Sequence, residues 1–402
     1  MAAGTAGRLL WAVVSDRFFA DRRASGLRVN AIHRAVRPHA SARSPLELSD
    51  LLPLSSREAT VKALRFHQYG GRDELIVESV PDPVAGPGEV VVKVGACALN
   101  HLDVDLREGV SRFPLSLPHT MGLEVAGTIT SCGAGVSEEW REGDRVAPYL
   151  MGTDPQHLMS RTGRENLSPS GFIGATIPGG FAEYVVIPER HLVRTPDAMT
   201  DVEAAAFQIG FSTSYHMLFT RGELKMGETV LINSVGSGIG AAAVQLARLA
   251  GAFVIGNASS EEKLAKAREL GMHEGINHAT HDVATEVRRI TADRGVDLVY
   301  EHVGGKLFQS GLDSLTRDGR LVTCGAHAGE VVELDIIPLF RNQTRIIGSF
   351  AFTSAEYEEV LRLAGLGLLK PQVHSTYSLD DAVKAFEVME ARQQFGKIVV
   401  TP

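Results

Sequence analysis

The sequence has few cysteines and lacks an apolar run long enough to cross a bilayer. Cys97, Cys132 and Cys324 lie far apart, with neither a Cys-x-x-Cys spacing nor an even disulfide framework. The longest apolar candidate near the N-terminus, residues 9–14, is shorter than a good signal-peptide core and far shorter than the roughly 18 residues of a membrane helix. We therefore expect a reducing compartment, the cytoplasm, and no membrane partner.

The chain also lacks a basic excess. It carries 40 Lys and Arg against 48 Asp and Glu, a net charge of -8, which offers no electrostatic footprint for nucleic acid. Its 402 residues, 44% of them hydrophobic, are enough for two domains with large cores. A small-molecule substrate is the better expectation.

Residues 1–60 differ in composition from the rest. They contain nine Arg, no Lys and five acidic residues, so this extension carries about +4. We favour a tail without function, because VKAL at 61–64 looks like the natural start of a folded domain. The alternative is a mitochondrial transit peptide, which such Arg- and Ser-rich, acid-poor segments resemble, and which would place the protein in the mitochondrial matrix.

Two different patterns follow the extension. Short β-rich runs at 75–80, 89–94, 122–130, 144–147 and 181–187, separated by turn residues, predict an antiparallel, barrel-like domain over 61–190 with a long polar loop at 149–179. After residue 190, buried strands alternate with helices, which predicts an α/β domain with a doubly wound parallel sheet over 191–349. Predicted helices at 355–366 and 379–391 and a strand at 397–400 complete the chain.

A glycine-rich turn opens the second domain. The segment VLINSVGSGIG at 230–240 follows a predicted strand and begins a helix. Gly236, Gly238 and Gly240 allow a tight turn and close approach of the backbone to a pyrophosphate, whose charge the helix N-terminus attracts. A plain turn between strand and helix is the alternative. We predict six cofactor-binding residues here: Ser234, Gly236, Ser237, Gly238, Ile239 and Gly240.

The end of the second strand favours NADPH over NADH. An acidic residue there would bind a ribose 2′-hydroxyl and repel a 2′-phosphate, but the segment reads GNASSEEK at 256–263. Ser259, Ser260 and Lys263 are suited to a phosphate dianion. Glu261 and Glu262 weaken this interpretation, and the alternative is that Ser259 only caps the helix while Lys263 is solvated.

Several motifs together resemble the medium-chain dehydrogenase/reductase superfamily over 61–402. They are ALNHLDVDLREG at 98–109, GLEVAG at 122–127, GDRV at 143–146, GGFAEY at 179–184, the glycine turn, Val303-Gly304 and FGK at 395–397. The resemblance implies a GroES-like catalytic domain, 61–190 completed by 350–402, around a Rossmann domain at 191–349.

Zinc-dependent members of that superfamily hold a catalytic metal at positions that read Asn100, Leu123 and Ile209 here. Leucine and isoleucine offer no lone pair, so we expect no catalytic zinc. The four positions of the structural zinc lobe read Asp154, His157, Ser160 and Ser168, a poor ligand set, although a weak Asp154/His157 site is an alternative. A zinc-binding family label should therefore not be taken literally for this chain.

The resemblance also implies which residues line a nicotinamide pocket. Thr213 matches the position that contacts the carboxamide, and Asn100 could donate its amide to substrate or ribose. His101 has the side chain best suited to deliver a proton, with an ordinary buried histidine as the alternative and solvent as another proton source. The remaining predicted cofactor contacts are Val303, Cys324, Gly325, Ala326, Phe350 and Lys397.

For several residues near the predicted site we expect structural and not catalytic roles. We expect Asp103 to orient its loop, Glu124 to hold the domain together and Cys324 to pack in the core. Asp105 stands where many quinone oxidoreductase-like members have tyrosine, so a tyrosine proton donor is not expected.

Without a Lewis acid, oxidation of simple alcohols is difficult at neutral pH. Hydride transfer to an activated acceptor needs only a hydrogen bond to the carbonyl oxygen on which charge develops. The sequence therefore predicts hydride transfer from NADPH to a quinone or an α,β-unsaturated carbonyl. The alternatives are an alcohol or aldehyde dehydrogenase of the same superfamily, and a cofactor-binding structural or regulatory protein with little turnover. We expect a homodimer through the apolar segment at 331–340, unless that segment is covered within the chain.

Overall fold

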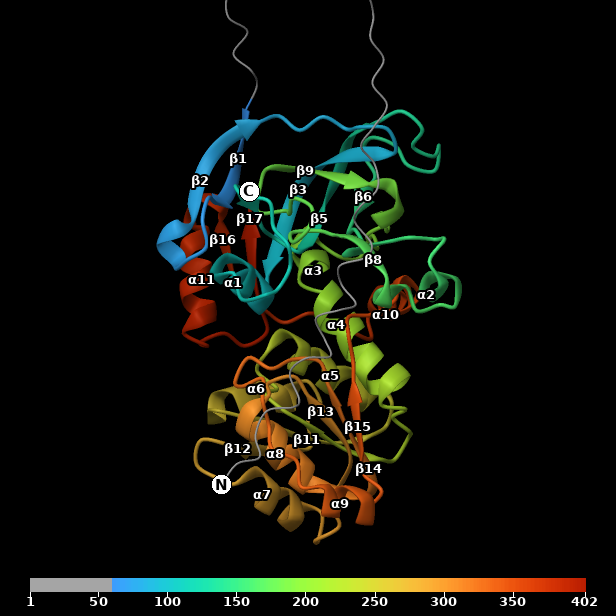
Figure 1. Ribbon diagram of the computed structural model, residues 1–402, viewed down its shortest axis with the longest axis vertical. Helices are drawn as coiled ribbons and strands as arrows, with labels where there is room; N and C mark the ends of the chain where they lie inside the picture. Colours follow the sequence, from blue (N-terminus) through green and yellow to red (C-terminus); the bar gives the residue numbers. More distant parts are fainter. Residues whose placement is uncertain (1–59) are drawn as a thin grey trace, which may run out of the picture. The chain divides into compact units, whose positions relative to one another are not determined.

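The protein is described by a computed structural model over residues 60–402 (Figure 1). The predictions of a tail or a transit peptide fall on the N-terminal extension, which lies outside these residues. Within the described part, none of the helices combines the length and apolar character that crossing a bilayer requires. Two six-stranded sheets, a three-stranded sheet, a two-stranded sheet and the helices packed on them make up this part of the chain.

A mostly antiparallel six-stranded sheet, with a three-stranded sheet beside it, forms the first lobe. Its central strand β3 (Glu89–Leu99) pairs antiparallel with three strands and buries most of its residues. The parallel strand β16 comes from the C-terminus and pairs with β17, so the end of the chain returns to the first lobe. The other strands of this lobe are β1 (Thr60–Phe66), β2 (Ile76–Pro81), β4 (His119–Thr120), β5 (Glu124–Cys132), β6 (Arg145–Val146), β9 (Tyr184–Pro188), β16 (Val373–Ser378) and β17 (Lys397–Thr401).

The second lobe is a six-stranded parallel sheet in the order β12-β11-β10-β13-β14-β15, the doubly wound Rossmann arrangement that the sequence predicts. Residues of the central strands, such as Leu231 and Val299, are fully buried. The strands are β10 (Thr229–Ile232), β11 (Phe253–Ala258), β12 (Glu274–Asn277), β13 (Val296–Glu301), β14 (Leu315–Thr323) and β15 (Arg345–Gly348). Its helices are α5 (Gly238–Leu249), α6 (Glu261–Glu269), α7 (Val283–Ile290), α8 (Gly305–Ser314) and α9 (Ile336–Arg341).

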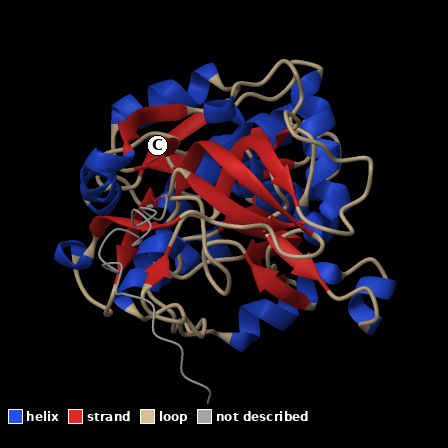
Figure 2. Cartoon of the chain, turned by 90° about the horizontal axis from the view of Figure 1, so that it is seen from above, coloured by secondary structure: helices blue, strands red, loops and turns tan. Residues whose placement is uncertain are grey.

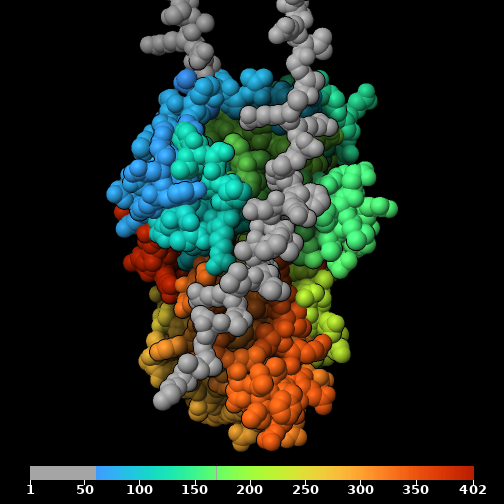
Figure 3. Space-filling view, viewed as in Figure 1, coloured from blue at the N-terminus to red at the C-terminus, as the bar shows by residue number. Residues whose placement is uncertain are grey.

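Helices connect and enclose the two lobes. Seen from above, most helices lie around the outside of the strands (Figure 2). Helix α4 (Gln208–Tyr215) packs on α5 of the second lobe and on α10 (Ser354–Gly365), so it joins the two parts. In the space-filling view the red C-terminal residues lie with the blue and green first lobe, above the yellow to orange second lobe (Figure 3). The remaining helices are α1 (His101–Glu108), α3 (Asp201–Ala205), the π-helix η4 (His216–Arg221) and α11 (Ala382–Glu390).

The prediction of a long polar loop at 149–179 is wrong in part. This segment contains β7 (Met151–Thr153), the one-turn helix α2 (Leu158–Arg161) and β8 (Pro169–Phe172), with β7 and β8 paired antiparallel. Buried apolar residues such as Met151 flank its polar centre and anchor it to the core. Composition averaged over the whole segment concealed these apolar ends.

Candidate functional site

The glycine turn between β10 and α5 is shaped to approach a phosphate group closely. Ser234 has a left-handed backbone with φ +52°, a strained conformation of the kind found at ligand sites. Ser237 caps α5 by accepting a hydrogen bond from Gly240 N at 2.9 Å. A Cβ on Gly240 would lie 2.3 Å from Ser234 O, so only glycine fits there. Ile239 follows in the first turn of α5.

Two lysine side chains cross this turn. A Cβ on Gly236 would lie 2.8 Å from Lys263 Cδ, and a Cβ on Gly238 would lie 2.6 Å from Lys397 Cδ. The bare glycine backbone and the helix N-terminus therefore lie beside the aliphatic stems of two lysines, whose ammonium groups bind Arg392 O in one case and Asn100 and Glu124 in the other. This combination fits the pyrophosphate of a dinucleotide.

A buried polar network supports the turn from below. Asn257, fully buried at the end of β11, donates to Asn233 Oδ1 at 2.6 Å and accepts from Ser234 N at 3.1 Å. His302 Nε2 donates to Asn233 O at 2.9 Å and lies 3.4 Å from Ser237 Oγ. The network fixes the turn through side chains from β10, β11 and the end of β13.

The end of β11 differs in detail from the sequence prediction. Ser260, and not the alternative Ser259, caps α6, while Ser259 is exposed. Lys263 Nζ donates to Arg392 O at 2.7 Å, and burial together with the Arg392 charge lowers the pKa of Lys263, although Glu262 opposes this. Burial and Lys263 also lower the pKa of His278. Sequence reasoning missed Arg392 and His278, because both lie far along the chain from the β11 end.

Asn100, Glu124 and Lys397 form the centre of the site, where the lobes meet. Lys397 Nζ donates to Asn100 Oδ1 at 2.6 Å and also contacts Glu124 Oε2. Asn100 Nδ2 donates to the same carboxylate at 2.9 Å, and Ile209 N donates to Glu124 Oε1 at 2.6 Å. Glu124 and Lys397 are both almost fully buried. The resemblance gave Glu124 only a structural role, whereas the structure places its carboxylate against two predicted site residues.

Asp103 fixes the turn that carries Asn100. Its Oδ2 accepts from Asn100 N at 2.8 Å and its Oδ1 accepts from Gly122 N at 3.1 Å. Burial raises the pKa of Asp103 to about 7, against the lowering effect of both backbone donors. The carboxylate thus orients its own loop and ties α1 to the start of β5.

The positions expected to match the family's zinc ligands carry side chains of other types in this chain. Asn100 is hydrogen-bonded to Lys397 and Glu124, and Leu123 is a fully buried side chain without a ligand atom. In the lobe at 154–168, Ser160 and Ser168 share a hydrogen bond of 2.8 Å, while His157 caps α2. Residues 60–402 contain no group of three or more His, Cys, Asp or Glu side chains placed to hold a metal ion.

The predicted nicotinamide segments come together at the ends of β13 and β14. Cys324 N donates to Glu301 O at 3.2 Å, and a Cβ on Gly325 would lie 2.5 Å from His302 O, so Cys324-Gly325-Ala326 packs directly on the β13 end. Val303 N donates to the buried Glu301 carboxylate at 2.7 Å. Burial raises the pKa of Cys324 to about 12, which makes it a poor nucleophile.

The two remaining predicted contacts lie in different environments. Thr213 is buried on α4, the helix that joins the lobes. Phe350 is half exposed, and its carbonyl oxygen accepts from Asn166 Nδ2 at 2.8 Å.

His101 lies at the start of α1, next to a second histidine. Its ring centroid is 5.0 Å from that of His327, and His327 Nδ1 is 3.6 Å from Asp105 Oδ2. Burial, followed by the neighbouring His327, lowers the pKa of His101 to about 4. Sequence reasoning missed His327, although it directly follows the predicted Cys324-Gly325-Ala326 segment.

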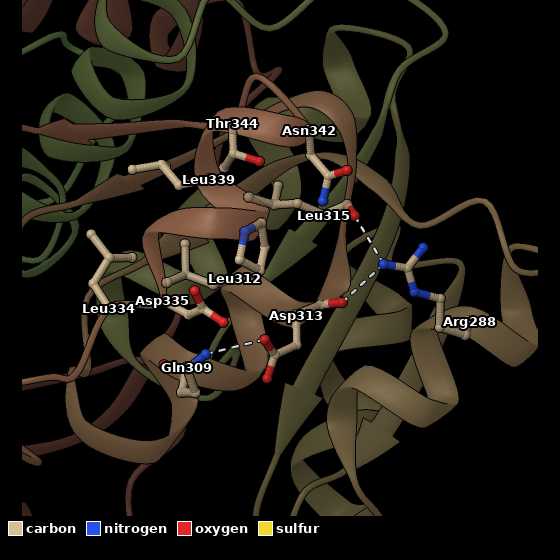
Figure 4. A pocket seen from close by; sticks show the side chains of 11 residues that line it. Arg288, Gln309, Leu312, Asp313, Leu315, Leu334, Asp335, Leu339, Asn342 and Thr344 are labelled. Atoms are coloured by element: carbon tan, nitrogen blue, oxygen red, sulfur yellow. Dashed lines mark hydrogen bonds between the residues drawn. The ribbon is translucent and has the colours of Figure 1, made fainter.

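A separate hollow of about 240 Å³ lies in the second lobe (Figure 4). It is bounded by α7, α8 and α9, and in it Arg288 donates to the carbonyl oxygens of Asp313 and Leu315. Among the described residues, its lining includes none of those predicted to bind cofactor or substrate. Leu334, Pro338 and Leu339 connect it instead to the apolar segment at 331–340.

Fold and site together define an oxidoreductase with a Rossmann lobe and a second lobe over its glycine turn. Residues 86–197 match the alcohol dehydrogenase GroES-like domain, and residues 238–365 match the zinc-binding dehydrogenase domain. Quinone oxidoreductase of Rattus norvegicus is 28% identical over 356 residues, covering 86% of this chain and 99% of the relative.

Solved structures agree with this comparison. A crystal structure of an NAD-dependent alcohol dehydrogenase has a TM-score of 0.81 at 34% identity, covering 85% of this chain and 99% of that one. A cobalt- and zinc-bound thermostable alcohol dehydrogenase from Pyrobaculum aerophilum has a TM-score of 0.78 at 28% identity, covering 86% and 100%. The chain belongs to the medium-chain dehydrogenase/reductase superfamily, as its motifs predict.

Proposed function

We propose that this protein is an NADPH-dependent reductase that delivers hydride to an activated acceptor, a quinone or an α,β-unsaturated carbonyl, without a catalytic metal. The observation that carries the proposal is the contact between Lys397 and Asn100 at 2.6 Å. Asn100 occupies a metal-ligand position of the zinc-dependent relatives, and a protein ammonium group lies against it. The similarity to quinone oxidoreductases supports the same reaction class.

The residue types at this site favour an acceptor that already carries an electrophilic carbon. Leu123 and Ile209 offer no lone pair to a metal, so the site lacks the ligands for a Lewis acid that would ionise a simple alcohol. The Lys397 ammonium has three N–H groups and donates to Asn100 and Glu124, so the third can face an oxygen on which negative charge develops. A reduced nicotinamide supplies the hydride when bound. The chain's own residues orient the acceptor and stabilise its oxygen.

The choice of NADPH rests on positive charge near the end of β11. Lys263 Nζ donates to the backbone carbonyl of Arg392 there, the Arg392 charge is close enough to lower the pKa of Lys263, and the adjacent His278 adds a further nitrogen. Asn257, one residue before the end of β11, turns its side chain into the network under the glycine turn. A 2′-phosphate would therefore meet cations and no acid from β11 itself, although Glu261 and Glu262 follow in the first turn of α6.

The test uses the purified full-length chain. Metal content is measured by mass spectrometry, and NADPH and NADH oxidation are followed at 340 nm with a panel of quinones and enones. We expect faster turnover with NADPH, and no loss of rate after dialysis against a chelator. Activity that disappears with the chelator and returns with zinc would contradict the metal-free proposal. Cofactor binding without turnover on any acceptor would favour a binding protein instead.

A further inference from the structure

Three titratable side chains from two distant parts of the chain meet beside the site. The rings of His101 and His327 have centroids 5.0 Å apart, and His327 Nδ1 lies 3.6 Å from Asp105 Oδ2. His101 and Asp105 are one helical turn apart on α1, so both side chains leave the same face of that helix. Helix α1 belongs to the first lobe and His327 to the second, so the cluster bridges the lobes.

The turn that carries His327 has a fixed position. Ala328 N donates to Val303 O at 2.8 Å, and Gly305 N donates to Gly329 O at 3.2 Å. A Cβ on Gly304, where φ is +80°, would lie 2.5 Å from Gly329 O, so this packing requires glycine. The backbone therefore holds the imidazole of His327 opposite α1.

The cluster also runs from the interior to solvent. His101 is partly buried and follows Asn100, which contacts Lys397 in the centre of the site. The side chain of His327 is 41% exposed, and that of Asp105 is 30% exposed. Two imidazoles at this separation can exchange a proton directly or through one water molecule.

We propose that His327, held in place by Asp105, is the proton source for the reduced acceptor, and that His101 passes the proton on. This inference rests on the proposed reductase function and names the groups that complete its reaction. His101 faces the acceptor, His327 connects it to solvent, and Asp105 is a positioning residue.

The proton transfer balances the hydride transfer. The acceptor carbon takes the hydride with both electrons of the nicotinamide C–H bond, and the acceptor's π electrons move to its oxygen. One ring N–H of His101 then breaks as the new O–H bond forms, while the other ring nitrogen of His101 takes the proton of the His327 imidazolium. Bulk water restores the proton on His327.

The surrounding groups are compatible with His327 as the proton source and His101 as the residue that passes the proton on. Because the pKa of His101 is lowered to about 4, its ring is neutral at pH 7 and can accept on one nitrogen while donating from the other. Burial raises the pKa of Asp105, and the charge of His327 opposes this. The other charged or titratable groups facing the cluster are Glu108 and Glu330 at Asp105, Arg392 and Lys397 at His101, and His302 at both imidazoles.

The experiment compares the full-length wild type with His327→Ala, Asp105→Asn and the matched surface control His281→Gln. The rate of enone reduction is measured by stopped flow from pH 5 to 9, with and without added imidazole. NADPH affinity is measured by fluorescence. The pKa of His327 is measured by NMR in the absence of substrate.

We expect His327→Ala to lower the reductive rate by about 10²-fold, the lower end of the effect of general acid catalysis, with unchanged NADPH affinity and partial rescue by imidazole. In the wild type the rate should fall as pH rises through the pKa of His327. Asp105→Asn should move both that midpoint and the NMR pKa to lower pH. His281→Gln should match the wild type.

A pH profile that is unchanged in His327→Ala, or an NMR pKa of His327 that Asp105→Asn does not move, would overturn the inference while leaving the reductase function intact. Loss of NADPH binding in His327→Ala would show that the cluster only joins the lobes. If the wild type reduces no acceptor at any pH, the proposed function fails and the proton route fails with it. The NMR titration would still report whether the two side chains are paired.

Discussion

The ammonium group of Lys397 contacts the carboxylate of Glu124 in the protein interior, although the two residues lie 273 positions apart in the chain. Lys397 begins the last strand and Glu124 begins β5. Both charges are almost fully removed from water, and Asn100 hydrogen-bonds to each of them. The same lysine stem crosses Gly238 in the phosphate turn. This ion pair therefore links the glycine turn between β10 and α5 to Asn100.

Removing one member of this pair should destabilise the fold strongly. Lys397→Met leaves the buried Glu124 carboxylate without its cation, so the free energy of unfolding should fall by about 3–5 kcal/mol. Adding Glu124→Gln to Lys397→Met should restore part of that loss, because no unpaired charge then remains inside. Urea denaturation of the three proteins measures this. A double variant less stable than Lys397→Met would show that the two residues contribute independently.

Cofactor preference should depend on the cations near the end of β11. Lys263→Ala is expected to raise the dissociation constant for NADPH about tenfold, and Arg392→Ala should act in the same direction, because each removes a charge that can face a 2′-phosphate. Affinity for NADH should stay within about twofold. Lys306→Ala, a lysine outside the site, is the matched control. Equal weakening of both nucleotides would place these side chains at the pyrophosphate instead, and isothermal titration calorimetry distinguishes the outcomes.

Acid should destabilise the protein through its buried histidines. Burial lowers the pKa values of His101, His191 and His302 from 6.5 to about 4. Between these pH values the unfolded chain binds more protons than the folded chain, so stability is full above pH 6.5 and is lost as pH falls toward 4. Asp103, whose folded pKa is raised to about 7 from 3.8, has the opposite sign and offsets part of the loss.

The pH dependence of unfolding by urea tests this expectation. In His191→Gln the free energy of unfolding should change less steeply with pH between 6.5 and 4, because one of the three buried imidazoles no longer titrates. The exposed His281→Gln should leave the slope unchanged. A slope that stays the same in His191→Gln would assign the acid sensitivity to other groups.

Self-association should involve the apolar segment at 331–340. Several of its side chains are strongly exposed, among them Val331 at 91%, Ile336 at 63% and Phe340 at 64%, and the neighbouring strand β15 is an edge of the parallel sheet. We expect a homodimer in sedimentation equilibrium at micromolar concentration, and a shift to monomer in the double variant Ile336→Glu with Phe340→Glu. Val84→Glu, at a residue of the first lobe that is 83% exposed, should leave the mass unchanged. A monomeric wild type would refute the prediction.

Local patterns were sufficient for the second lobe and its cofactor turn. Alternation of buried strands with helices predicted the parallel sheet, and the glycines at 236, 238 and 240 predicted a turn after β10, where Gly240 packs against Ser234 O and leaves no room for a Cβ. The segment at 149–179 was misjudged, since its polar composition outweighed short apolar ends whose partners lie elsewhere in the chain. The roles of the individual site residues stay predictions that the experiments above test.

The sequence by itself determined the fold class and the glycine turn, because each depends on residues close together in the chain. Tertiary structure decided which distant charges meet. It brought Lys397 to Glu124, Arg392 to Lys263 and His327 to Asp105, and in each case the partners come from separate segments. No periodicity or spacing encodes such contacts, since they arise only when the C-terminal strand and the β14 turn pack against the first lobe and the glycine turn.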